Sequence, residues 1–295
     1  MSVTGMDLKS LLLFSVTVIG FGLAFSLTNI AVTSIPPLWV AAGRSLIALL
    51  GLGTFLLMRA RPIMFERAHI PAYFWVGLLT GVVPYVSISW GQQFIPSSLA
   101  GVLFASTPLL TLILGFVLFK APRPRIMALL GAAVGLGGVG LALSGSVETS
   151  PHVVRGAAAT LCAAASYAIG GLVLQRERVT DMTGFSTVQL IPVTAILVTI
   201  AWMASGLPSG GFTSQSMLAL VALGLVGTCI PLLCLFNLVK FRGASSASLT
   251  TFFIPFAAII IGVGFLDETF SAIALFGLLT ALLGSFLVFC NQTKG

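Results

Sequence analysis

Charged residues are scarce in this sequence of 295 residues. Lysine, arginine, aspartate and glutamate together make up 7% of it, whereas hydrophobic residues make up 58%. Soluble domains carry about 25% charged residues, which cover their surface. So little charge excludes a soluble globular domain and a disordered chain. The net charge of +7 does not indicate a nucleic-acid partner either, because the basic residues are scattered and form no continuous patch.

Cysteine and histidine are also rare. The four cysteines lie inside apolar runs, where cysteine behaves as a small hydrophobic residue. No Cys-x-x-Cys pair and no cysteine–histidine cluster occurs, so the sequence predicts neither a disulfide framework nor a metal site. Gly135–Gly140 fits the G-x-G-x-x-G pattern, but no strand precedes it and it lies in an apolar helix. We therefore predict no nucleotide cofactor.

Long apolar runs are what the sequence does contain. A membrane helix needs about 20 predominantly apolar residues, and cutting the sequence at proline, glycine and charge leaves ten such runs. We predict an all-α polytopic membrane protein whose transmembrane helices are approximately Lys9–Asn29, Pro37–Met58, Pro71–Gly91, Ser98–Phe119, Ile126–Ser144, Val154–Leu174, Gly184–Ser205, Gln215–Val239, Ser245–Leu266 and Ser271–Cys290.

The linkers between these runs differ in charge. If the N-terminus is cytoplasmic, twelve of the 14 basic residues fall on the cytoplasmic side, Arg155 lies outside and Arg44 lies within a span. This is the asymmetry of the positive-inside rule. It predicts N-in and C-in topology in a bacterial inner membrane, with Arg61 and His69 cytoplasmic and Glu148 external.

The two halves of the sequence resemble each other. Ser97–Gly101 precedes Pro108 in the fourth span, and Ala244–Ser248 precedes Pro255 in the ninth, at an offset of 147 residues in both features. Five helices per half place the halves in opposite orientations, as in transporters with a midplane site between inverted repeats. The predicted repeats are residues 1–147 and 148–295.

These features resemble a known family. The matching residues are Gly20–Gly22 with Ala24 and Phe25, Pro37 with Arg44, the small-residue starts of the fourth and ninth spans with Pro108 and Pro255, and the acidic pair Asp267–Glu268. The chain resembles the drug/metabolite transporter superfamily, of the EamA type, and within it is similar to YddG-type amino-acid exporters. At the equivalent junction of the first half, Lys120–Pro122 departs from the pattern. The resemblance implies a ten-helix basket with a central cavity formed by most of the first four helices of each half, and with the fifth and tenth helices at its side.

Charge inside the spans points to Arg44 alone. An arginine at membrane depth is costly, so it must face protein or water. We leave open whether Arg44 is held structurally or contacts the carboxylate of a substrate. All seven acidic residues and both histidines fall in linkers or at helix ends. The sequence therefore favours transport without an obligatory proton or sodium gradient.

Mid-span prolines and polar or aromatic stripes indicate a cavity. Proline bends a helix and frees a carbonyl group, although packing kinks are the alternative explanation. Trp90 could equally be a membrane-interface anchor. The predicted cavity is walled by helices 1, 3, 4, 6, 8 and 9, and its residues are Tyr85, Ser89, Trp90, Phe104, Thr107, Pro108, Ser166, Tyr167, Thr228, Pro231, Thr251 and Pro255.

The leading functional hypothesis is a secondary carrier that exports amino acids or related small metabolites. Export of sugars, nucleosides or lipophilic compounds is the alternative, and a passive pore or an intramembrane enzyme is a less favoured one. The bilayer and a small-molecule substrate are the expected partners. The glycine-rich helices 5 and 10 also suggest a homodimer.

Overall fold

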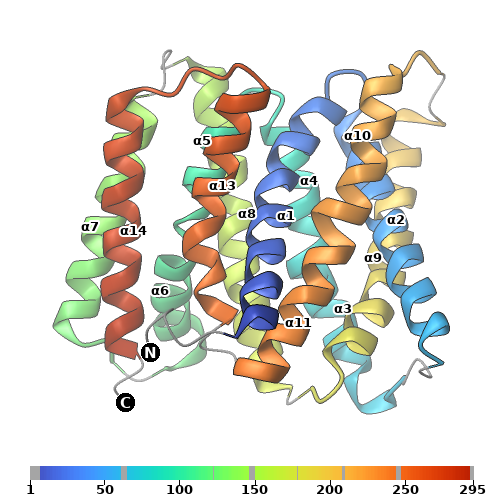
Figure 1. Cartoon of the computed structure of the whole chain (residues 1–295), viewed down its shortest axis with the longest axis horizontal. Coiled ribbons are helices and arrows are strands. Elements are labelled where there is room, and N and C mark those ends of the chain that lie inside the picture. The colour runs from blue at the N-terminus through green and yellow to red at the C-terminus, as the bar shows by residue number, and fades with distance from the viewer. Residues whose placement is uncertain are drawn as a thin grey trace.

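The computed structural model describes residues 7–60, 65–121, 123–145, 150–177, 179–207, 210–243 and 247–292. Within these ranges the chain consists of helices and short connections (Figure 1). Helices are the expected solution in hydrocarbon, because each backbone N–H and C=O group then finds its partner within its own segment. The all-α fold class predicted from the sequence is confirmed.

Ten spans build the described part of the molecule. Nine are long and apolar enough to cross a membrane, and the ninth span in sequence, α13, is a shorter apolar helix. The first half comprises α1 (Leu8–Ala31), α2 (Pro37–Met58), η2 (Arg67–His69) with α3 (Ile70–Gly77), η3 (Leu78–Val82) and α4 (Val83–Gly91), α5 (Ser97–Phe104) with α6 (Thr107–Phe119), and α7 (Ile126–Ser144). The second half comprises α8 (Pro151–Arg176), α9 (Met182–Ser205), α10 (Ser214–Gly224) with η4 (Leu225–Cys229) and α11 (Ile230–Arg242), α13 (Thr250–Phe265), and α14 (Ala272–Gln292).

Prolines interrupt the third and eighth spans at equivalent places. Pro84 and Pro231 are 147 residues apart, and each follows a five-residue π-helical turn, η3 or η4. A proline has no N–H for the carbonyl group four residues before it, so the preceding turn can widen. In η3 the carbonyl oxygen of Leu79, five residues before Pro84, accepts a hydrogen bond of 2.7 Å from Ser166 Oγ on α8. The two widened turns are thus a paired structural feature of the repeats.

The fifth and tenth spans, α7 and α14, pack along each other at one edge of the molecule (Figure 1). A Cβ atom on Gly138 would lie 2.6 Å from the carbonyl oxygen of Gly277, and one on Gly131 would lie 2.8 Å from that of Gly284. The missing side chains let the two backbones approach closely. We call this contact the glycine seam. The glycine-rich faces for which the sequence predicts a homodimer are therefore occupied within a single chain.

Basic residues gather at one end of the bundle, the end at which α1 begins and α14 finishes. We call it the termini face, and it is the lower face in Figure 1. The described basic residues there are Lys9, Arg59, Arg67, Lys120, Arg123, Arg125, Arg176, Lys240 and Arg242, whereas Arg155 lies near the start of α8 at the opposite end. His69 also lies on the termini face, which the positive-inside rule predicts to be cytoplasmic. Arg61, Glu148 and the Ala244–Ser246 part of the ninth-span motif lie outside the described residues.

Candidate functional site

A cavity of about 510 Å³ lies between the two halves of the molecule. Its described lining comes from spans of both halves and includes no residue of α7 or α14. Leu174, Met182 and Val239 line it within one turn of the helix ends on the termini face. The cavity therefore extends from the middle of the bundle to the predicted cytoplasmic face.

Arg44 is the one charged residue among the described residues that line the cavity. It is 5% exposed. Its Nε donates a hydrogen bond of 2.9 Å to Thr228 Oγ1, and its guanidinium carbon lies 4.2 Å from the centre of the Tyr85 ring. The second span thus contributes the cation, the third contributes the aromatic ring and the η4 turn contributes the hydroxyl. These contacts fix Arg44 at the cavity wall without neutralising its charge.

Aromatic rings form a second part of the wall. The ring of Phe25 lies 5.6 Å from that of Phe104, which in turn lies 5.5 Å from the ring of Tyr167 in an edge-on arrangement. Phe21 and Phe236 add two further rings to the lining. Mild polarity comes from hydroxyl and amide groups, which in the described lining belong to Thr80, Tyr85, Thr107, Tyr167, Ser186, Gln189, Thr228, Ser248, Thr250 and Thr251. A mostly apolar cavity with few polar groups suits a small amphipathic molecule.

Some of the residues predicted for the cavity lie in its lining and others do not. Arg44, Tyr85, Phe104, Thr107, Tyr167, Thr228 and Thr251 line it. Trp90 lies outside the lining, is 40% exposed and packs edge-on against Phe94 near the end of α4, which is the behaviour of an interface anchor. Ser89 and Ser166 are buried between helices, and Ser166 is occupied by its hydrogen bond to Leu79.

The predicted prolines also lie outside the lining. Pro231 packs against Gly20 of α1, and Pro255 lies beside Gly101 of α5. Pro108 stands at the start of α6, where the fourth span is interrupted. Each ring shapes a helix and fills space next to it, so packing kinks describe these prolines better than direct contact with a ligand does.

The seventh span contributes a wall that the sequence reasoning missed. Ser186, Gln189 and Val193 of α9 line the cavity, and α2 joins them through Arg44. One signal was available, since Gln189 is an amide inside the span, three residues before Pro192.

The face opposite the termini is closed by contacts between the halves. The carboxylate of Glu268, which follows α13, accepts hydrogen bonds of 2.7 Å from Ser97 N, 2.7 Å from Ser97 Oγ and 2.9 Å from Ser98 N. These donors belong to the start of α5 in the first half. Ser26 Oγ of α1 lies 3.2 Å from Ser97 Oγ and extends the network. We call the contact of Glu268 with Ser97 and Ser98 the outer clamp.

The two halves are unequal at this point. Lys120 directly follows α6 and Asp267 lies two residues after the end of α13, and both have φ of 53°. The next residues, Ala121 and Glu268, donate from N–H to the carbonyl oxygens of Gly115 and Gly262. Ala121 is therefore the structural counterpart of Glu268. It has no carboxylate, so it cannot form such a clamp on the termini face. The hydrogen bonds of Glu268 therefore join the two halves at the face opposite the termini, whereas the lining of the cavity reaches the termini face.

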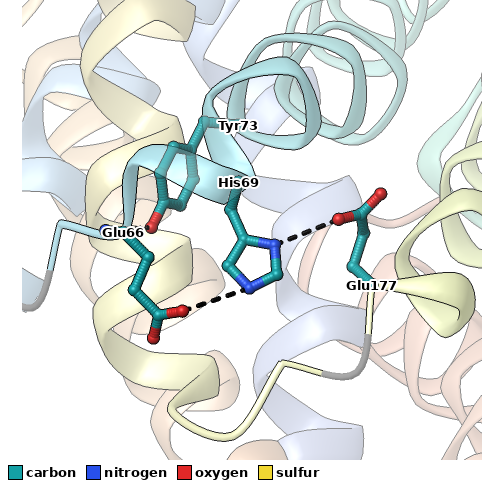
Figure 2. A network of polar contacts seen from close by, with 4 residues as sticks. All are labelled: Glu66, His69, Tyr73 and Glu177. Atoms are coloured by element: carbon teal, nitrogen blue, oxygen red, sulfur yellow. Dashed lines mark hydrogen bonds and ion pairs between the residues drawn. The ribbon is translucent and has the colours of Figure 1, made fainter.

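A second polar cluster lies at the termini face (Figure 2). His69 stands between two carboxylates, with Nδ1 3.0 Å from Glu177 Oε2 and Nε2 3.3 Å from Glu66 Oε2. Its ring also meets Tyr73 and Phe185 edge-on. The cluster joins the start of the third span to the end of the sixth and the start of the seventh. It is separate from the cavity lining, so it does not place a titratable group at the midplane.

Both halves of the chain are similar to one family of known proteins. The sequence profile of the EamA-like transporter family matches residues 8–144 and 154–290. YoaV of Bacillus subtilis, named as an uncharacterized transporter, is 25% identical over 95% of this chain and 93% of its own. YedA of Escherichia coli K12, named as an uncharacterized inner membrane transporter, is 29% identical over 88% of this chain and 84% of its own. The protein PagO of Salmonella typhimurium is 23% identical over 84% and 82%, respectively.

A solved crystal structure shares the fold. It covers 95% of this chain and 98% of its own, with a TM-score of 0.62 and 20% sequence identity. At that identity the similarity concerns the arrangement of the helices alone.

Proposed function

The chain belongs to the EamA-like transporter family and is a multi-pass inner-membrane transporter, and we propose that it exports amino acids or related small metabolites by alternating access. Its relatives YoaV and YedA carry the name of transporter, so it is a transporter rather than an enzyme. What we propose beyond the family is the class of substrate, the outward direction of transport and the mechanism of alternating access.

One observation supports the mechanism above all. The cavity between the halves reaches the termini face, whereas the outer clamp closes the opposite face. Carriers built from inverted repeats bind substrate near the midplane and expose the site to each side in turn by moving one part against the other. The arrangement described above corresponds to the inward-facing stage of that cycle.

The size and lining of the cavity support small amphipathic substrates. Its volume of about 510 Å³ lies within the range of 300–1,000 Å³ that is usual for small-molecule sites. The similarity to YddG-type exporters, seen in the sequence motifs, favours amino acids within this class. Export requires only a high concentration of the substrate inside the cell, because a tenfold concentration gradient supplies about 1.4 kcal/mol of free energy.

The experiment is counterflow with purified protein in liposomes. Vesicles preloaded with one unlabelled compound from a panel of amino acids, sugars, nucleosides and lipophilic amines are diluted into the same labelled compound. Saturable and stereoselective counterflow is expected for amino acids. Non-saturable flux of every compound would instead indicate a pore, and saturable flux of sugars or nucleosides alone would replace the substrate class.

A variant that fills the cavity tests this route, and a variant on the lipid-facing surface is its control. Thr107→Trp places a bulky ring in the lining and is expected to abolish counterflow. Leu218→Trp changes an apolar side chain that is 71% exposed on α10 and lies outside the cavity lining, and it is expected to leave counterflow unchanged. Equal activity of the two variants would contradict transport through this cavity.

We also propose that the carrier forms a homodimer. Since the glycine seam is occupied, a second copy would pack on the outward faces of α7 and α14, where Leu130 and Phe276 are exposed. Native mass spectrometry in detergent tests this, and a monomer at all protein concentrations would refute it.

A further inference from the structure

We infer that the substrate carries a carboxylate that binds Arg44, with an apolar or aromatic body in the rest of the cavity. This inference rests on the proposed function and specifies the chemistry of the same site. It starts from the hydrogen bonds of Arg44. Within the described part of the chain the guanidinium makes a single hydrogen bond, from Nε to Thr228, and no ion pair. Its two Nη groups remain available.

A buried cation without a counter-ion is an unusual feature of a membrane span. Charged side chains at membrane depth normally pair with another charge or with carbonyl groups. Here the Tyr85 ring and the Thr228 hydroxyl orient the guanidinium, but neither carries a negative charge. No aspartate or glutamate lies among the described residues of the lining. The counter-charge must therefore arrive with the ligand.

The geometry of the guanidinium selects the kind of anion. Nε faces Thr228, so the end of the planar group, with Nη1 and Nη2, is the edge left for a ligand. Two parallel N–H groups match the two oxygens of a carboxylate, and such bidentate pairs are among the stronger hydrogen bonds in proteins. Stacking on Tyr85 holds the plane in place before the ligand binds. A carboxylate fits this preorganised edge.

The remainder of the lining defines the body of the ligand. The rings of Phe25, Phe104 and Tyr167 form a continuous aromatic wall. A cationic amine would find only neutral acceptors, such as the side-chain oxygen of Gln189, which is buried and has no hydrogen-bond partner among the described residues. We therefore expect the carboxylate to be required and an α-amine to be tolerated but not required.

Four compounds that share a phenyl group separate the contribution of the carboxylate from that of the amine. L-Phenylalanine has both groups, 3-phenylpropionate has only the carboxylate, L-phenylalaninamide has the amine and a neutral amide, and 2-phenylethylamine has only the amine. Binding is measured by thermal shift and calorimetry on the purified wild-type protein. The two carboxylates are expected to bind at least tenfold more tightly than the other two. Equal binding of all four, or no binding of either carboxylate, would overturn the inference.

Variants at Arg44 test whether the guanidinium is the cause. Arg44→Gln is expected to weaken 3-phenylpropionate at least tenfold and to leave phenylalaninamide unchanged, whereas Arg44→Lys keeps the charge, loses the planar fork and gives an intermediate value. A merely structural arginine would weaken all probes alike. Thr228→Val removes the partner of Nε while keeping the Nη edge, so it should retain the preference for carboxylates. If Arg44→Gln does not fold, the wild-type probe series still decides.

Different results would refute the proposed function and this inference. Saturable counterflow of compounds without a carboxylate would refute the inference and leave the carrier function intact. Tight binding of the carboxylates without any counterflow would support the site and contradict the carrier function.

Discussion

The outer clamp is expected to set the balance between inward-facing and outward-facing states. Glu268 accepts three hydrogen bonds from the start of α5, and the α13–α14 connection that carries it belongs to the other half. Opening the outer face must separate these groups. Glu268→Gln removes the charge while keeping the size of the side chain, so it should favour the outward-facing state.

The size of the effect follows from the hydrogen bonds. A hydrogen bond to a charged group contributes about 1.5–3 kcal/mol net, because water replaces it when it breaks. The three bonds share one carboxylate, and the glutamine oxygen can still accept one of them, so the full sum does not apply. Taking a loss of about 2–3 kcal/mol, the outward-facing fraction should rise roughly 30- to 150-fold while that state remains the minor one.

Labelling from outside measures this fraction. A cysteine replaces Thr107 in the cavity of a variant without the four native cysteines, and a membrane-impermeant thiol reagent is added to right-side-out vesicles. Asp267→Asn is the matched control, since it loses the same charge one residue earlier, at a site without a hydrogen bond or ion pair among the described residues. Labelling of Glu268→Gln within twofold of the wild type, or equal acceleration by Asp267→Asn, would refute the role of the clamp.

Three further predictions follow from features already described. Gly138→Ala should destabilise the glycine seam by about 1–3 kcal/mol and lower the melting temperature in detergent, whereas Gly137→Ala, which points to open space, should not; equal melting temperatures would contradict the seam. Cysteines in place of His69 and Arg155 should react from the cytoplasmic and outer sides of sealed vesicles, respectively, and the reverse pattern would overturn the topology. Net transport should need no proton or sodium gradient, because no acidic residue or histidine lies in the described lining. Uphill accumulation of a zwitterionic substrate without net charge that requires a pH gradient and vanishes in Glu268→Gln would disprove this.

The architecture was largely predictable because hydrocarbon imposes few solutions. An apolar run of about 20 residues must be helical there, and basic residues mark one side. The interruptions were harder to predict. The prolines at positions 84 and 231 are visible in the sequence, but the π-helical turns before them depend on partners such as Ser166 on another span.

Sequence alone predicted the site best where a residue type is rare inside a membrane span. Arg44 stands out because a cation at membrane depth has a large solvation cost. Tyr85 and Thr228 were singled out by type, but their contacts with Arg44 join spans that are far apart in sequence. The predicted prolines and Trp90 lie outside the lining of the cavity, because sequence alone does not show which side of a helix faces it. Glu268 was recognised as a family feature, whereas its partners Ser97 and Ser98 required the fold.

The glycine seam has a consequence for biosynthesis. α7 completes the first half, but its partner α14 leaves the ribosome roughly 150 residues later. At about 5–20 residues per second, α7 therefore waits for roughly 7–30 s with its close-packing face uncovered. Through that interval the backbone of Gly131 and Gly138 meets lipid or another nascent helix instead of Gly284 and Gly277. A chain that stops before α14 never covers this face.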